Sequence, residues 1–137
     1  MSVIWVLFLV LLQRLGLNIS LNEQEAVVLF SQSNGALFKI LFCVSAVIFA
    51  PFIEEYVFRA GIYRALKARI DTKWAAFFAS VVFAAMHFNL VSFVPLFVFS
   101  QYLIKYYECS GNINVPIVIH GAFNLNSVVL ITLSINL

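Results

Sequence analysis

A long apolar run, residues 36–53, leads directly into two adjacent glutamates, Glu54 and Glu55, and Arg59 follows four residues after the second. A charged side chain near the middle of a bilayer is costly, so acidic residues there are rare and usually functional or paired. On a helix, Glu55 and Arg59 share a face and can form an ion pair, whereas Glu54 points about 100° away from Glu55. Glu54 therefore needs a partner from elsewhere in the fold, or it takes up a proton.

The composition indicates a membrane protein. Of the 137 residues, 64% are hydrophobic and 10% are charged, and the mean hydropathy is +1.03, whereas soluble domains are about half apolar and about a quarter charged. The length indicates a single domain, residues 1–137. The net charge of +2 and the lack of a long basic tract indicate no nucleic-acid partner. Cys43 and Cys109 are isolated, which favours small buried side chains over a disulfide or metal site.

Residues 1–12 form the first apolar stretch and predict a first membrane helix. A signal peptide fits less well, because no basic segment precedes the stretch and no small-residue cleavage site follows it. A polar connection, residues 18–35, then leads to the second span at residues 36–53. Pro51, near the end of that span, is expected to kink the helix and to help aim the two glutamates into the bundle.

Apolar residues 74–103 are too long for one ordinary span and barely long enough for two, so a turn is expected near residues 87–92. Gly111 and Asn112 mark the next turn, and residues 115–137 form the last span. These stretches together predict an all-α polytopic transmembrane helix bundle of four to five spans.

Residues 59–73 contain five of the eight basic residues. Apolar side chains recur within this segment at helical spacing, which predicts an amphipathic helix at the membrane surface. The positive-inside rule places the segment on the cytoplasmic side. The apolar positions are Ile62, Tyr63, Leu66 and Ile70.

Three pairs of residues four positions apart interrupt the apolar segments: Glu55 with Arg59, Phe83 with His87, and His120 with Asn124. This spacing places the two members of each pair on one helix face. Polar groups in membrane bundles often serve only to hydrogen-bond helices together, and that explanation suits any one of these groups alone. It does not account for both histidines of the chain, two glutamates, an arginine and an asparagine at membrane depth.

Such a set of side chains favours hydrolysis. Glu54 and a histidine could bind one water molecule and take its proton, while the other histidine and an asparagine amide could donate hydrogen bonds to the resulting oxyanion. Two histidines and one or two glutamates could instead bind zinc, and the side chains available for that are Glu54, His87 and His120. Their spacing is not His-Glu-x-x-His, so the metal alternative rests on composition alone. Serine and aspartyl mechanisms have no matching motif in the sequence.

The motifs Glu-Glu-x-x-x-Arg, Phe-x-x-x-His and His-x-x-x-Asn, in this order, resemble those of the CAAX-protease and bacteriocin-processing (CPBP, or Abi) intramembrane proteases. That family includes the type II CAAX prenyl endopeptidases and bacterial members linked to bacteriocin maturation or immunity. The resemblance covers about residues 46–129, which would be the catalytic core. It implies a glutamic-type endopeptidase without a required metal or cofactor, in which Glu54 and His87 activate the water.

The resemblance also implies that His120 and Asn124 form an oxyanion hole and that Glu55 and Arg59 support the site. The implied partners are a peptide or protein substrate and the lipid bilayer. The small size of the chain favours a bacterial or archaeal cytoplasmic membrane. Relatives commonly have more membrane helices, so this chain would be a reduced version of the fold, completed by self-association. Two alternatives stay open: a non-catalytic membrane immunity or scaffold protein, and a zinc-dependent membrane peptidase.

Overall fold

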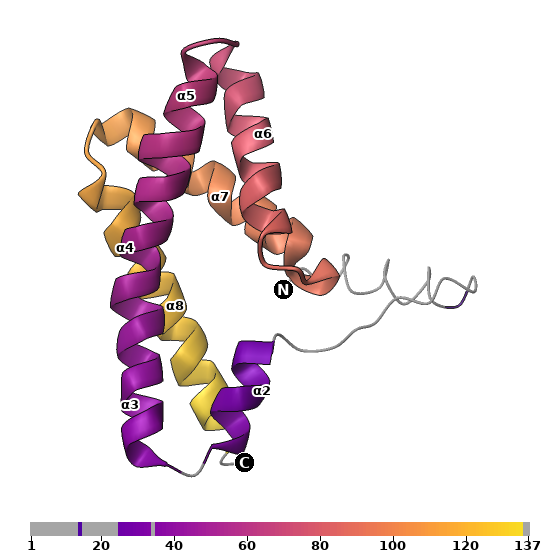
Figure 1. Cartoon of the computed structure of the whole chain (residues 1–137), viewed down its shortest axis with the longest axis vertical. Helices are drawn as coiled ribbons and strands as arrows, with labels where there is room; N and C mark the ends of the chain where they lie inside the picture. The colour runs from indigo at the N-terminus through magenta and orange to yellow at the C-terminus, as the bar shows by residue number, and fades with distance from the viewer. Residues whose placement is uncertain (1–13, 15–24, 34, 136–137) are drawn as a thin grey trace.

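The computed structural model describes residue 14, residues 25–33 and residues 35–135. Within these parts of the chain every regular element is a helix, which confirms the all-α prediction (Figure 1). The first membrane helix predicted at residues 1–12 lies outside the described residues. The elements in chain order are α2 (Glu25–Gln32), α3 (Ala36–Val44), η1 (Ser45–Phe49), α4 (Ala50–Glu55), η2 (Tyr56–Tyr63), α5 (Arg64–Lys67), α6 (Thr72–Ala85), α7 (Leu90–Ser110) and α8 (Asn114–Ile135).

The segments from α3 to α5 form one continuous helix of 32 residues, Ala36–Lys67. Two parts of it, η1 and η2, are π-helical and have wider turns than an α-helix. Pro51 accounts for η1, because a proline has no N–H and its ring clashes with the carbonyl four residues earlier in a regular α-helix. The backbone widens just before Pro51, and the helix then continues without a break (Figure 1).

The basic segment at residues 59–73 does not form the separate surface helix that the sequence predicted. Residues up to Lys67 continue the long helix, and a turn then leads into α6. Tyr63 explains the difference: its side chain is fully buried, so the apolar face of this segment packs against protein. The core cluster there comprises Tyr63, Ala75, Ala79 and Ile104.

Three of the described helices are long and apolar enough to cross a membrane, judged by length and composition: Ala36–Lys67, Leu90–Ser110 and Asn114–Leu133. Helix α6 is also apolar but has only 14 residues. Such a helix is about 21 Å long, whereas the hydrocarbon core of a bilayer is about 30 Å thick. The described residues therefore do not confirm the expected count of four to five spans.

Both predicted turns are confirmed. The chain leaves α6 at Ala85 and enters α7 at Leu90, close to the turn expected near residues 87–92. Asn89 caps α7, because its Oδ1 accepts a 2.9 Å hydrogen bond from the N–H of Ser92. Gly111 ends α7 with a φ of 62°, a left-handed conformation that glycine adopts without strain.

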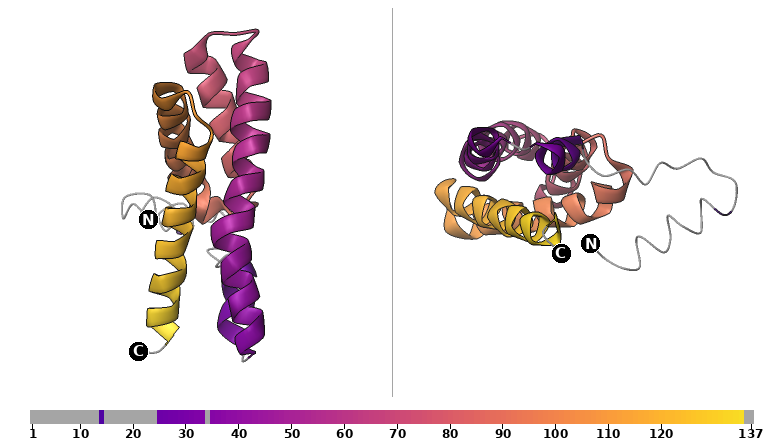
Figure 2. Two further views of the ribbon diagram at one scale, coloured as in Figure 1. Left: turned by 90° about the vertical axis from the view of Figure 1, so that its left-hand side faces the viewer. Right: turned by 90° about the horizontal axis from the view of Figure 1, so that it is seen from below.

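Helix α8 lies beside the long helix, and α6 packs against α7 toward the other end of the molecule (Figures 1 and 2). Along the long helix, α8 contacts η1 and α4, whereas α6 contacts η2 and α5. The segment that carries the two glutamates is therefore flanked by α8 on one part of its length and by α6 on the next. This arrangement brings together the three motifs, which lie far apart in the sequence.

Candidate active site

The ion pair that the spacing predicts between Glu55 and Arg59 is present and is fully enclosed. Arg59 Nε lies 2.8 Å from Glu55 Oε2, and neither side chain has any exposed surface. Arg59 Nη2 also donates a 3.2 Å hydrogen bond to Ser100 Oγ on α7. The guanidinium group lies 4.7 Å from the centre of the Phe83 ring on α6. Arg59 thus connects the long helix to α6 and α7.

His120, on α8, lies between the two glutamates and is itself buried. Its Nδ1 is 2.8 Å from Glu55 Oε1, and its Nε2 is 3.8 Å from Glu54 Oε2. Nδ1 donates to the Glu55 carboxylate, which fixes the orientation of the imidazole ring. Glu55 therefore bridges Arg59 and His120 through its two oxygens, and His120 Nε2 is left facing Glu54.

Glu54 differs from Glu55 in its exposure and in its hydrogen bonding. Its side chain is 28% exposed, but Oε2 is buried and has no hydrogen-bond partner among the described residues. The 3.8 Å distance to His120 Nε2 is too long for a direct hydrogen bond. Buried polar atoms are nearly always hydrogen-bonded, so this oxygen lacks the partner that such an atom normally has.

His87 lies beside this cluster across the ring of Phe83. Its Nδ1 is 2.8 Å from the Phe83 carbonyl oxygen, and because a carbonyl can only accept, Nδ1 carries the proton and Nε2 keeps its lone pair. The Phe83 ring centre is 5.0 Å from that of His87 and 5.9 Å from that of His120. Within the described part of the chain, His87 makes no hydrogen bond or ion pair with Glu54.

Asn124, one turn after His120, binds the backbone of the long helix. Its Nδ2 donates a 2.8 Å hydrogen bond to the carbonyl oxygen of Ala46. That carbonyl is available for a physical reason: the N–H of Ala50 donates to Ser45 instead, and the next residue, Pro51, has no N–H. A carbonyl that loses its helical donor needs another partner, and the asparagine amide supplies it.

Gly121 allows this close contact between α8 and η1. A Cβ atom built on Gly121 would lie only 2.7 Å from the carbonyl oxygen of Val47. The carbonyl oxygen belongs to the main chain and the position of a Cβ is set by the backbone, so no side-chain rotation could relieve the clash. The glycine therefore lets α8 approach closely enough for His120 to reach Glu55, in the manner of small residues at other membrane helix interfaces.

A family model described as "Type II CAAX prenyl endopeptidase Rce1-like" matches residues 36–126, well over half of the chain. The match contains all three motifs and every residue of the site described above. The chain belongs to the Rce1-like family.

Membership of the Rce1-like family makes this chain a protease of the CAAX type, and with its three long apolar helices it is an integral membrane protein whose substrates are peptides in the lipid bilayer. This agrees with the resemblance drawn from the motifs. No curated protein and no solved structure matches the chain.

The described residues of this Rce1-like chain contain no group of three or more His, Cys, Asp or Glu side chains that could hold a metal ion. No such group is formed by the three side chains that the composition offered to zinc, Glu54, His87 and His120.

Four contributors to the Rce1-like site were missed by reasoning from the sequence. Phe83 stands in a motif, but its role as the ring that touches Arg59 and both histidines appears only in the structure. Ser100 is a polar residue in an apolar run, which is a weak indication by itself. The remaining two are the contact of Gly121 with Val47 and the hydrogen bond that the Ala46 carbonyl accepts from Asn124, and both depend on the packing of α8.

Proposed function

We propose that this Rce1-like chain hydrolyses a peptide bond with a water molecule activated by Glu54. The observation that carries the proposal is the buried, unpartnered Oε2 of Glu54, which faces the Nε2 of His120 at 3.8 Å. The other nitrogen of His120 is fixed by Glu55, which is itself held by Arg59. A free carboxylate oxygen beside an oriented imidazole is an arrangement suited to general base catalysis.

In the proposed reaction, Glu54 accepts a proton from water while the water oxygen attacks the scissile carbonyl carbon. The new C–O bond forms as the carbonyl π electrons move onto oxygen, giving a tetrahedral oxyanion. Collapse of this intermediate breaks the C–N bond, and Glu54 returns its proton to the departing amine. The product carboxylic acid and the amine leave, and the carboxylate of Glu54 is regenerated.

His120 and Asn124 are the proposed donors to the oxyanion. His120 already donates through Nδ1 to Glu55, so Nε2 can donate only in the doubly protonated imidazolium form, whose charge the adjacent carboxylates balance. Asn124 uses one N–H of its amide on Ala46, which leaves the second N–H for the substrate. Oriented donors of this kind contribute about 10²–10³-fold in rate each.

His87 is proposed to position the attacking water rather than to contact Glu54. With Nδ1 bonded to the Phe83 carbonyl, the lone pair of Nε2 can accept a hydrogen bond from water. One water molecule would then donate hydrogen bonds to His87 Nε2 and to the Glu54 carboxylate, and so connect His87 to the cluster around His120. Replacing His87 by alanine should lower kcat more than it lowers thermal stability.

The proposed substrate is a peptide segment at the membrane, either a CAAX-type tail or a bacteriocin-type precursor. The test compares peptide termini from cells expressing wild type, Glu54→Gln, and the control Asp71→Asn at equal membrane abundance. Asp71 is exposed in the turn before α6 and makes no side-chain cap hydrogen bond, so its change controls for loss of a carboxylate.

New termini that persist in Asp71→Asn and vanish in Glu54→Gln would support the proposal, and the cleavage sites would identify the substrate class. General base loss is expected to lower the rate by about 10²–10⁴-fold. Identical termini in all three samples, with normal folding, would instead favour a non-catalytic immunity or scaffold protein.

A further inference from the structure

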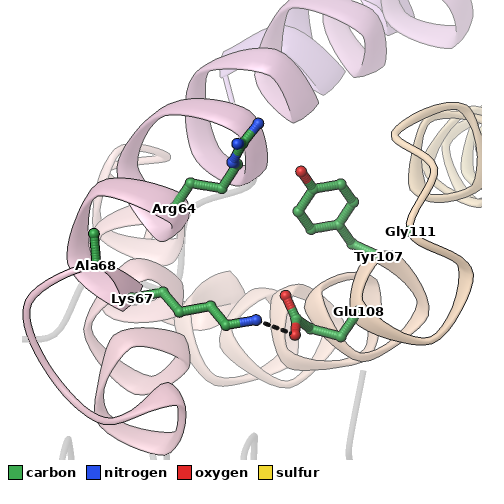
Figure 3. Close-up of a pocket in the computed structure, with 6 residues that line it drawn as sticks. All are labelled: Arg64, Lys67, Ala68, Tyr107, Glu108 and Gly111. Atoms are coloured by element: carbon green, nitrogen blue, oxygen red, sulfur yellow. Dashed lines mark hydrogen bonds and ion pairs between the residues drawn. The ribbon is translucent and has the colours of Figure 1, made fainter.

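A second polar region lies at one end of the long helix, where α5 faces the last turns of α7. It surrounds a cavity of about 380 Å³ (Figure 3). Arg64, the lining residue nearest to the site in sequence, follows Arg59 by five residues and Glu54 by ten, which is about 7.5 Å and about 15 Å along a helix axis. No residue of the candidate active site lines the cavity. Its lining residues are Arg64, Lys67, Ala68, Tyr107, Glu108 and Gly111.

Of the two basic side chains that line this cavity, one is paired with a carboxylate and the other, Arg64, has no such partner among the described residues. Lys67 and Glu108 form an ion pair with each other across the cavity. The guanidinium of Arg64 has no ion pair or hydrogen bond within the described part of the chain. Figure 3 shows this group and the Tyr107 hydroxyl extending into the same space between α5 and α7. A guanidinium beside a phenolic hydroxyl offers several N–H and O–H donors to one bound anion.

The position of the cavity indicates which anion it meets. It lies at the ends of two helices that are long and apolar enough to span a membrane, Ala36–Lys67 and Leu90–Ser110. The ends of membrane spans lie at the level of the lipid headgroups. Two further exposed basic residues, Arg69 and Lys73, follow in and just after the adjoining turn. Basic pockets between membrane helices at this depth bind anionic headgroups.

We propose that this cavity binds the phosphodiester headgroup of an anionic glycerophospholipid. Arg64 contacts the phosphate oxygens through two of its N–H groups, as guanidinium groups commonly do, and Tyr107 donates its hydroxyl hydrogen to the same phosphate. Lys67 stays paired with Glu108, so the site accepts a single negative charge. Gly111 has no atom near its Cβ position, which leaves room beside the cavity for the headgroup.

The test uses the purified full chain in detergent and measures retained lipid by native mass spectrometry. Phosphatidylglycerol is offered to wild type, Arg64→Gln and the control Arg69→Gln, which removes another exposed arginine that does not line the cavity. Loss of a charged hydrogen-bond partner should reduce lipid retention by roughly tenfold in Arg64→Gln. Arg69→Gln should change it by less than about twofold, because Arg69 lies outside the cavity and its charge reaches the lipid only through water and salt. Equal losses in the two variants would overturn the proposal.

Two further arms separate the possible sources of the anion. Phosphatidylcholine, which has the same phosphodiester but no net charge, should be retained less than phosphatidylglycerol, and equal retention would contradict the charge argument. Inorganic phosphate should not displace phosphatidylglycerol at matched concentration, because it lacks the acyl chains. Full displacement would assign the cavity to free phosphate instead of lipid. Tyr107→Phe keeps the ring and should lower retention less than Arg64→Gln does.

Discussion

Two ion pairs of the long helix differ in burial, and the difference sets what each pair contributes to the molecule. Arg59 and Lys67 lie eight residues apart, about two helical turns, and each pairs with a glutamate. The pair of Arg59 with Glu55 has no exposed surface. The side chains of Lys67 and Glu108 are 38% and 34% exposed. The buried pair holds His120 in place, whereas the exposed pair borders an open cavity.

The difference lies in what each pair needs from its surroundings. Removing two charges from water is unfavourable unless further hydrogen bonds satisfy them. In the buried pair, Arg59 donates to Ser100 and Glu55 accepts from His120. An exposed pair keeps its water and gains little from the contact. The buried pair therefore depends on its protein neighbours, whereas the pair at the cavity depends mainly on water.

The largest effect should come from breaking the buried pair. Arg59→Met leaves the Glu55 carboxylate buried beside a neutral side chain, which should lower the free energy of unfolding by about 3–5 kcal/mol. Thermal unfolding of the purified chain in detergent measures this. The double variant Glu55→Gln/Arg59→Met removes both charges and should be more stable than Arg59→Met alone. A single variant as stable as wild type would show that the enclosed pair is not needed.

The next effect tests the backbone contact that brings His120 to the buried pair. Gly121→Ala places a Cβ 2.7 Å from the Val47 carbonyl oxygen, so α8 must move away from η1. We expect a loss of about 1–3 kcal/mol in the free energy of unfolding, as for other overpacked sites, together with loss of proteolysis.

Gly61→Ala is the matched control for that change. A Cβ at Gly61 would lie 3.5 Å from the Tyr56 carbonyl oxygen, an ordinary contact, and alanine favours a helix over glycine by about 1 kcal/mol. Gly61→Ala should therefore unfold at the same temperature as wild type or higher. Similar losses in both variants would contradict the close contact of α8 with η1.

A smaller effect on stability is expected at Pro51. Pro51→Ala restores a backbone N–H that can compete with Asn124 for the Ala46 carbonyl oxygen. Because alanine removes buried ring atoms but favours the helix, the two effects on the free energy of unfolding oppose each other and should leave a change of about 1 kcal/mol or less. The catalytic rate should fall by roughly tenfold, because the Asn124 amide loses its fixed orientation.

Steady-state kinetics distinguish this role of Pro51 from simple destabilisation. If Asn124 acts on the transition state, kcat should fall while KM stays nearly unchanged. A fall in activity that follows the loss of folded protein would instead assign Pro51 a purely structural role.

The sequence predicts contacts within a helix better than contacts between helices. The Glu55–Arg59 pair follows from a spacing of four residues. The turn near residues 87–92 follows from the length of the apolar stretch, and the turn at Gly111 follows from its turn-forming residues. The bond from Asn124 to Ala46 does not follow, because it depends on how a proline alters the turn before it and on how close α8 comes.

The wrong prediction of a surface helix at residues 59–73 has the same origin. The apolar face was identified correctly, but periodicity cannot tell whether such a face meets lipid or protein. Tyr63 meets Ala75, Ala79 and Ile104, so the segment stays within the long helix. The lack of a contact between His87 and Glu54 likewise depends on the Phe83 ring, which spacing along the chain does not reveal.

The smallest effect is expected at the exposed pair. Lys67→Gln and Glu108→Gln should each change the free energy of unfolding by less than about 1 kcal/mol, because water replaces the lost partner. A double-mutant cycle on these two residues should give a coupling energy of about 0–1 kcal/mol, decreasing as salt is raised. The same cycle on Glu55 and Arg59 should give several kcal/mol with little dependence on salt, because the pair is enclosed. A coupling of similar size in both pairs would mean that burial does not determine the strength of these two contacts.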